Sequence, residues 1–388
     1  MDKAAFMNQV LEDLVDSIDI PPSHYERAIE RYKSLGRWFH REGSPIANLD
    51  PDVFPQGSFR LGTPTRPVFT DQEYDLDLVC HVLLTKGDTT QQGLKALIGD
   101  DVKAYAHSNN LKARPTEKKR CWRLDYADDI SFHMDILPAI PNEELIKEAL
   151  LKEGVAPDEA VSAIAITDNT HPGYSVISPD WPQSNPEGFA QWFEKRMRQG
   201  EMRHALSLVK QGAYASIQEV PAHQCKTILQ RAVQLLKQHR DVMFKDQMDL
   251  KPISIIITTL AGRAYHGQAD LYGALQDIIA AMPGLVRGQE PRIANPVNPN
   301  EDFADKWKSD SRLEQNFWTW HKRVGQDIER LAEPAGADDL TKLIRRSLDV
   351  SIDEDDLIRF GAAPTAAVVS AAPRIQVKSG PQPWSDSA

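Results

Sequence analysis

The chain has 388 residues, enough to bury a large core and to form two domains that pack against each other. It carries 45 lysines and arginines against 56 aspartates and glutamates, a formal net charge of −11. Proteins that follow duplex phosphates usually present a basic face, so activation by a long nucleic acid is not expected. No run of about 18 uncharged apolar residues appears, and we expect no membrane-spanning helix. The three scattered cysteines suit a reducing cytosol, so we expect a cytoplasmic protein.

Two amphipathic helices are expected at the amino terminus. Apolar residues recur at helical spacing between residues 6 and 18. After a Pro-Pro pair a longer helix begins, with Ser23 and Glu26 in a capping-box pattern. Its apolar stripe between residues 25 and 39 indicates packing against a core.

A tight turn is expected at Gly57 and Ser58, where the most distinctive stretch of the chain begins. Glycine permits a left-handed backbone, and the N–H groups of such a turn, with the serine hydroxyl, can hold phosphate oxygens. Gln56 directly precedes the turn and is a further candidate for this role. The turn therefore predicts a phosphate cradle.

A strand with two aspartates follows the turn. Alternation between residues 73 and 83 places Asp75 and Asp77 on one face of this strand. Leu76 and Leu78 then point into a core on the other face. Two like charges held side by side are costly unless divalent cations lie between them. The strand therefore predicts metal ligands.

A helix is expected next, from residue 89 to 109, and then a strand from 120 to 126. This strand carries Arg123 on its polar face. The guanidinium can balance the acids, contact a second nucleotide or pair with Asp125, and the sequence leaves these alternatives open.

A third strand, residues 130–137 ending at Pro138, carries Asp135 on the polar face of an otherwise apolar segment. Three carboxylates can hold two Mg²⁺ or Mn²⁺ ions, one on the triphosphate and one lowering the pKa of an attacking hydroxyl. His133 shares the face of Asp135, but such chemistry needs no imidazole base, so we interpret it as an ordinary polar-face histidine.

Together these residues resemble a known signature. Gly57-Ser58, then Asp75-x-Asp77, then Asp135 is similar to the pattern of the polymerase-β-like nucleotidyltransferase superfamily. The wider context, PQGSFRLGT, EYDLDLV and FHMDILPA, resembles the bacterial cyclic-oligonucleotide synthases known as CD-NTases. The resemblance implies an α+β fold: a polymerase-β-like mixed sheet with an amino-terminal spine helix, and an oligoadenylate-synthase-like α-helical bundle.

Three parts are expected along the chain. Residues 1–180 form the nucleotidyltransferase core with its amino-terminal helices, and a Pro-rich junction ends it. Residues 181–361 have a helical pattern, which indicates a bundle that completes the nucleotide cleft. Residues 362–388 show little patterned hydrophobicity and are expected to be a flexible tail. The resemblance makes Ala388 a candidate point for conjugation or for a regulatory protein.

The helices expected in the second part are 188–197, 202–214, 223–244, 253–265, 269–282 and 311–331. Pro186 suits the first turn of the first helix, with Asn185 as its cap. Residues 292–302, rich in Pro and Asn, are predicted to be an ordered loop.

Two residues of the bundle are candidates for the donor triphosphate. Lys237 and Ser254 resemble the family's pairing of a helix lysine with a serine that starts the next helix. The residues alone also allow a solvated lysine and a plain helix N-cap.

The resemblance implies a metal-dependent nucleotidyltransferase. It would join nucleoside triphosphates, with ATP and GTP expected, into a cyclic di- or trinucleotide second messenger and release pyrophosphate, in bacterial antiphage signalling. One alternative is a terminal nucleotidyltransferase acting on RNA or a small molecule, which the acidic balance disfavours. Another is a non-catalytic nucleotide-binding module, which the complete carboxylate set disfavours.

Overall fold

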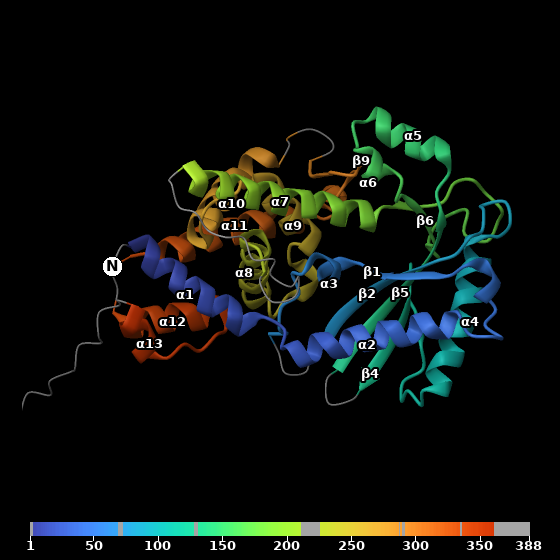
Figure 1. Cartoon of the computed structure of the whole chain (residues 1–388), viewed down its shortest axis with the longest axis horizontal. Helices are drawn as coiled ribbons and strands as arrows, with labels where there is room; N and C mark the ends of the chain where they lie inside the picture. Colours follow the sequence, from blue (N-terminus) through green and yellow to red (C-terminus); the bar gives the residue numbers. More distant parts are fainter. Residues whose placement is uncertain are drawn as a thin grey trace, which may run out of the picture.

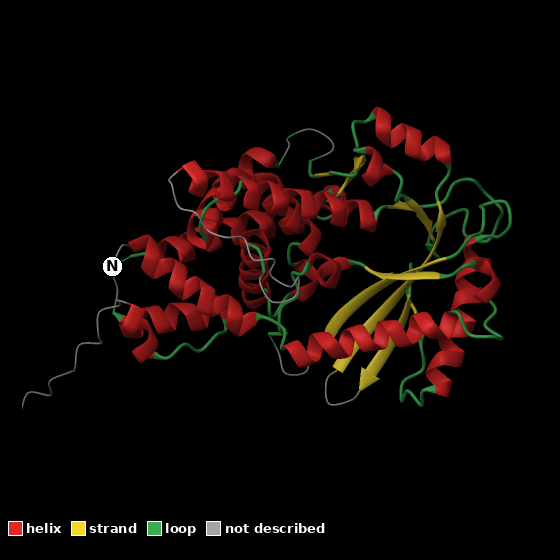
Figure 2. Cartoon of the chain, viewed as in Figure 1, coloured by secondary structure: helices red, strands yellow, loops and turns green. Residues whose placement is uncertain are grey.

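The computed structural model describes residues 3–68, 73–127, 131–210, 226–286, 288, 292–333 and 336–360. A mixed β-sheet lies on one side of the molecule and a bundle of helices on the other (Figures 1 and 2). The α+β architecture expected from the sequence is confirmed. Within the described ranges, no helix combines the length and apolar content needed to cross a bilayer. The expected tail, with Ala388, lies outside the described residues.

The sheet has seven strands in the order β1-β2-β5-β4-β3, with β6 on β5 and β7 on β6. They are β1 (Asp52–Pro55), β2 (Tyr74–His81), β3 (Thr116–Glu117), β4 (Trp122–Ala127), β5 (Ser131–Pro141), β6 (Ile164–Ile166) and β7 (Gln183–Ser184). Among the described strands of this sheet, only β2 and β5 pair in parallel. The expectation that the third strand ends at Pro138 is wrong. β5 continues to Pro141 because its last residues pair with β6.

The two faces of the sheet differ in polarity. Leu76 and Leu78 of β2, with Met134 and Ile136 of β5, are buried in one hydrophobic cluster. Side chains of α2 (Pro22–Phe39) and α4 (Gln91–Ser108) complete this cluster. Figure 1 shows α2 lying across that face of the sheet. The aspartates point away from these helices, so alternation along the strands separates core from site.

The capping box expected at Ser23 and Glu26 does not form. α2 begins directly after Pro21, and no side chain caps it. Pro22 occupies the first helical turn, where the missing N–H would have no intrahelical partner.

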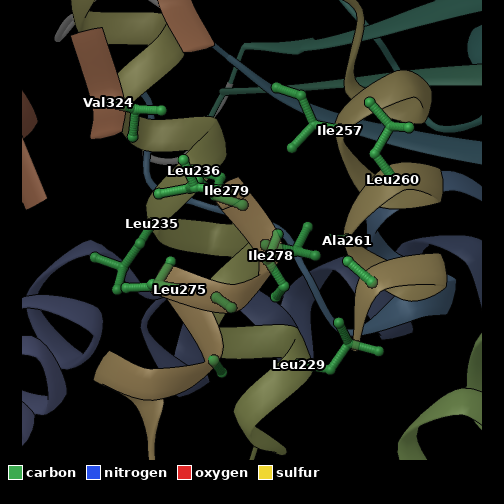
Figure 3. Close-up of a cluster of buried hydrophobic side chains, with 14 of the residues drawn as sticks. Leu229, Leu235, Leu236, Ile257, Leu260, Ala261, Leu275, Ile278, Ile279 and Val324 are labelled. Carbon is green, nitrogen blue, oxygen red and sulfur yellow. The ribbon is translucent and has the colours of Figure 1, made fainter. Parts of the chain in front are cut away.

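The second core is helical. Its helices are α1 (Lys3–Ile18), α7 (Pro186–Lys210), α8 (Ile228–Met243), α9 (Ser254–Ala264), α10 (Leu271–Leu285), α11 (Ser311–Leu331), α12 (Ala337–Leu348) and α13 (Glu354–Phe360). Apolar side chains of α8, α9 and α10 gather at its centre (Figure 3). α1 contributes to this core although the sheet follows it in sequence. The division at residues 180 and 361 stays a prediction.

Several expected helices are confirmed with shifted ends. Asn185 caps α7 as expected, since its Oδ1 accepts a hydrogen bond of 3.0 Å from the Gly188 N–H. α7 is one helix where two were expected over 188–214, and the described part of the chain resumes after it at residue 226. The expected loop at 292–302 contains a hairpin, β8 (Ala294–Asn295) with β9 (Asn298–Asp302). Two short helices, α5 (Glu144–Lys152) and α6 (Pro157–Ala160), follow β5.

Gly99 explains how a helix with an internal glycine packs closely on the sheet. A Cβ at Gly99 would overlap the indole ring of Trp122, which is buried and donates a 2.8 Å hydrogen bond to the Lys95 carbonyl. We expect Gly99→Ala to lower the free energy of unfolding by about 1–3 kcal/mol through overpacking, measured by urea denaturation. The matched control is Gly284→Ala in α10, where a Cβ meets no atom within 4 Å. Equal stability of the two variants would contradict this packing role.

Candidate active site

The predicted carboxylates lie on neighbouring strands. Asp77 of β2 is the register partner of Asp135 of β5, and Asp75 precedes Asp77 by two residues on the same face. The Asp75 side chain is 67% exposed. Loss of solvent contact, followed by the charges of Asp75 and Asp135, raises the pKa of Asp77 to about 7. The structure therefore brings the three predicted carboxylates together on one polar face.

Arg123 lies on β4, the strand next to β5, at the level of Asp135. It is the register partner of Asp135, and its Nε and Nη2 donate hydrogen bonds of 2.7 Å to the two carboxylate oxygens. Its Nη2 also lies 4.0 Å from Asp75 Oδ1. Of the alternatives left open by the sequence, Arg123 balances the acids, and the pair with Asp125 does not form.

The turn expected at Gly57 is the first turn of the short helix α3 (Gly57–Leu61). Gly57 has φ of +62°, and a Cβ there would overlap the carboxylate of Asp77. Only glycine therefore lets the turn lie against β2 without displacing Asp77. The Gln56 N–H donates a 2.8 Å hydrogen bond to the Asp77 carbonyl, whereas Ser58 lines the cavity beside the acids.

A cavity of about 1010 Å³ separates this polar face from the bundle. Its sheet wall includes Ser58, Asp75, Asp77 and Arg123. Its bundle wall includes Lys237, Arg240, Asp241, Lys251 and Ser254. Phosphates that reached the acids would therefore face cations across the cavity.

Lys237 lies on the bundle wall, and its ammonium group is hydrogen-bonded to a backbone carbonyl. Its Nζ donates a 2.7 Å hydrogen bond to the carbonyl of Thr63, just after α3. Burial, followed by the charge of Arg240, lowers the pKa of Lys237 to about 7. Gln230 and Gln234 of the same helix donate to the carbonyls of Leu61 and Pro64. This face of α8 therefore holds residues 61–64, which follow the Gly57-Ser58 turn.

Ser254 is the first residue of α9, and Ile253 is the N-cap, so the plain N-cap interpretation is wrong. Its Oγ accepts a 2.9 Å hydrogen bond from Arg240 Nη1. Arg240 also pairs with Asp241 at 2.7 Å, and Asp241 accepts a 2.6 Å contact from Lys251.

Arg240, Asp241 and Lys251 were not among the site residues predicted from the sequence. Helical spacing from Lys237 could have found Arg240 and Asp241, because residues three and four positions apart share a helix face. Lys251 carries no comparable signal, because it precedes α9 in a connecting segment.

Glu73, Asp125 and His133 form a second group of polar side chains on the same face of the sheet. Nδ1 of His133 is 2.7 Å from Glu73 Oε2 and 2.8 Å from Asp125 Oδ1. One ligand atom from each of the three residues lies within 4.8 Å of the others, a spacing that can hold a metal ion. From the sequence, His133 was predicted to be an ordinary polar-face histidine, and its two acidic partners were not predicted. Alternation extended two residues from Asp75 to Glu73 would have indicated the group.

The three predicted carboxylates suit a divalent cation. They offer only oxygen ligands, which Mg²⁺ and Mn²⁺ prefer. Burial, followed by the like charges of Asp75 and Asp135, raises the pKa of Asp77, and a bound cation would favour its ionised form again. The donor set therefore fits the metal expected from the sequence.

Gly57→Ala should impair catalysis much more than stability. The substitution strains the backbone by about 1–2 kcal/mol and pushes the Asp77 carboxylate from its place. Since small misplacements of reacting groups can cost about 100-fold in rate, we expect a loss of that order. Gly43→Ala is the matched control, because Gly43 has φ of +85° and a Cβ there meets no atom within 4 Å. If Gly57→Ala and Gly43→Ala had equal activities as well as similar melting temperatures, the role of Gly57 would be contradicted.

The raised pKa of Asp77 predicts a pH-dependent penalty in metal-free protein. The folded pKa of about 7 exceeds the unfolded value of about 3.9, so stability falls as pH rises between them. Asp77→Asn removes this loss, and its gain in melting temperature should be larger at about pH 8 than at about pH 5. Saturating Mg²⁺ should favour the wild type instead. A gain of the same size at both pH values would contradict the shift.

Comparison with known proteins places these residues in context. Residues 51–138 match the family model of the nucleotidyltransferase domain of cyclic GMP-AMP synthase DncV-like proteins. The chain is 26% identical over 347 residues to the c-di-GMP synthase of Roseivirga ehrenbergii, covering 87% of this chain and 83% of that protein. It is 28% identical over 334 residues to the cyclic dinucleotide synthase CdnG of Bradyrhizobium diazoefficiens, covering 81% of this chain and 73% of that protein.

The solved structure of CdnG from the same organism, a CD-NTase in complex with GTP, shares the fold. It superposes with a TM-score of 0.64 at 24% identity and covers 91% of this chain and 98% of that one.

Proposed function

Because this chain belongs to the CD-NTase family of cyclic-oligonucleotide synthases, we propose that it joins nucleoside triphosphates into a cyclic di- or trinucleotide and releases pyrophosphate. The observation that carries this proposal is the row of Asp77, Asp135 and Arg123 across three strands, with Asp75 beside it. Asp75, Asp77 and Arg123 line a cavity of about 1010 Å³ with cations on its opposite wall, and Asp135 lies behind them, bonded to Arg123.

Each part of the site has a role in this proposal. Asp75, Asp77 and Asp135 would hold two Mg²⁺ ions, or Mn²⁺ in their place. Bound metal lowers the pKa of the attacking ribose hydroxyl and offsets charge on the triphosphate. Ser58, with the backbone N–H groups of its turn, would hold phosphate oxygens of the donor.

The bundle wall would complete the grip on the donor. Lys237 and Ser254 remain the proposed phosphate ligands, and Arg240 joins them because its guanidinium already donates to the Ser254 hydroxyl. Lys237 would then exchange its bond to the Thr63 carbonyl for one to phosphate. A phosphate beside Lys237 would also favour its charged form and raise its pKa.

The names of the relatives support guanine nucleotides as substrates and a cyclic dinucleotide as the product. One relative is a c-di-GMP synthase, and CdnG is a cyclic dinucleotide synthase solved with GTP. We therefore propose GTP as a substrate, with ATP as a second candidate. A role in antiphage signalling and conjugation at Ala388 stay predictions.

The product tests the proposal. Wild-type protein given all four nucleoside triphosphates and Mg²⁺ should release pyrophosphate and form a product that resists phosphatase, because a ring has no free phosphate end. Mass spectrometry then gives ring size and bases. A phosphatase-sensitive chain would indicate a terminal nucleotidyltransferase instead.

Asp75→Asn with Asp77→Asn should abolish pyrophosphate release while the fold persists, since two of the three metal ligands are lost. Asp100→Asn is the matched control, because Asp100 is an exposed acid on α4 that pairs with Lys103. Unchanged turnover in the double variant would reject the carboxylates as metal ligands. No pyrophosphate from the wild type would indicate a binding module.

A further inference from the structure

Arg123 occupies the oxygens of the third carboxylate. Both oxygens of Asp135 accept 2.7 Å hydrogen bonds from the one guanidinium, in the paired geometry that makes arginine a strong carboxylate partner. The side chains are 26% and 20% exposed, so the pair is only partly screened by water. Neither Asp75 nor Asp77 has a comparable cation within hydrogen-bond distance among the described residues.

A divalent cation must compete with this guanidinium. Each oxygen of Asp135 keeps a second lone pair, but a cation bound there would meet the positive charge of Arg123 at close range. The same charge also reaches Asp75, 4.0 Å from Nη2. Metal can therefore bind the three carboxylates fully only as the Arg123 pair weakens.

We propose that Arg123 is a positioning residue that takes the place of the metal in the metal-free enzyme and competes with it for Asp135. Arg123 keeps the strands together while the carboxylates are crowded, and it sets how much divalent cation the enzyme needs. This inference rests on the metal site of the proposed function.

The test measures metal binding directly. Mn²⁺ is titrated into protein without nucleotide, and free Mn²⁺ is followed by electron paramagnetic resonance. Arg123→Met keeps much of the side-chain stem but removes the charge and the paired bonds, so we expect about tenfold tighter Mn²⁺ binding. Arg123→Lys keeps the charge and loses the paired geometry, so its affinity should fall between those of Arg123→Met and the wild type.

Melting temperatures give a second readout. Without metal, Arg123→Met should melt below the wild type, because the acids lose their counter-ion. With saturating Mn²⁺ the difference should narrow. A residue that acted only on packing would lower both melting temperatures equally.

Arg120→Met is the matched control. Arg120 lies three residues before Arg123, and its Nε pairs with Asp168 at 2.8 Å. This variant removes the same charge but leaves the Asp135 pair, so its Mn²⁺ affinity should match the wild type.

Three outcomes would overturn the role of Arg123 while leaving the metal site intact. They are unchanged or weaker Mn²⁺ binding by Arg123→Met, an Arg123→Lys affinity outside the expected order, and an equal gain in Arg120→Met. Mn²⁺ binding by the wild type that is absent in Asp77→Asn supports the metal site itself. Failure of the wild type to bind Mn²⁺ would overturn both the metal site and this inference.

Discussion

Asp77 and Asp135 lie at one level of two parallel strands, with Asp75 two residues away on the same face, and this crowding of carboxylates is the constraint on which the rest of the structure depends. Asp77 and Asp135 face each other across the β2–β5 pair, and neither can turn into the apolar core behind. Two neighbouring residues make this crowding possible. Arg123 supplies a counter-charge from β4, and Gly57 leaves room for the Asp77 carboxylate where any side chain would displace it. The carboxylates and the Gly57 turn are thus in place without a ligand, while Arg123 holds Asp135.

The bundle contacts the backbone beside this site rather than the site carboxylates Asp75, Asp77 and Asp135. α8 donates from three side chains to the carbonyls of Leu61, Thr63 and Pro64, at the end of α3 and directly after it. Arg60 of α3 adds ion pairs of 2.8 and 2.6 Å to Glu187 and Glu194 of α7. Hydrogen bonds to backbone do not depend on which residues occupy the segment, so the joint fixes its path while leaving its sequence free for other roles.

The sequence predicted the site where a short pattern determined the geometry. Alternation is local, so it predicted that Asp75 and Asp77 share one face of their strand and that Asp135 lies on the polar face of another. The partner of Arg123 could not be predicted in this way. Asp125 is closer in sequence, but the antiparallel register of β4 with β5 puts Asp135 opposite. Pairings across strands depend on register, which residue spacing alone does not determine.

The joint between α8 and the segment after α3 has a mechanical consequence. Gln230, Gln234 and Lys237 donate to the carbonyls of Leu61, Pro64 and Thr63, so the chain that follows Ser58 is tied to α8 at three points along one edge of the cavity. If Lys237 exchanges its bond for one to phosphate, the two glutamines still hold this chain. A change of partner at Lys237 therefore does not release the connection between the sheet and the bundle.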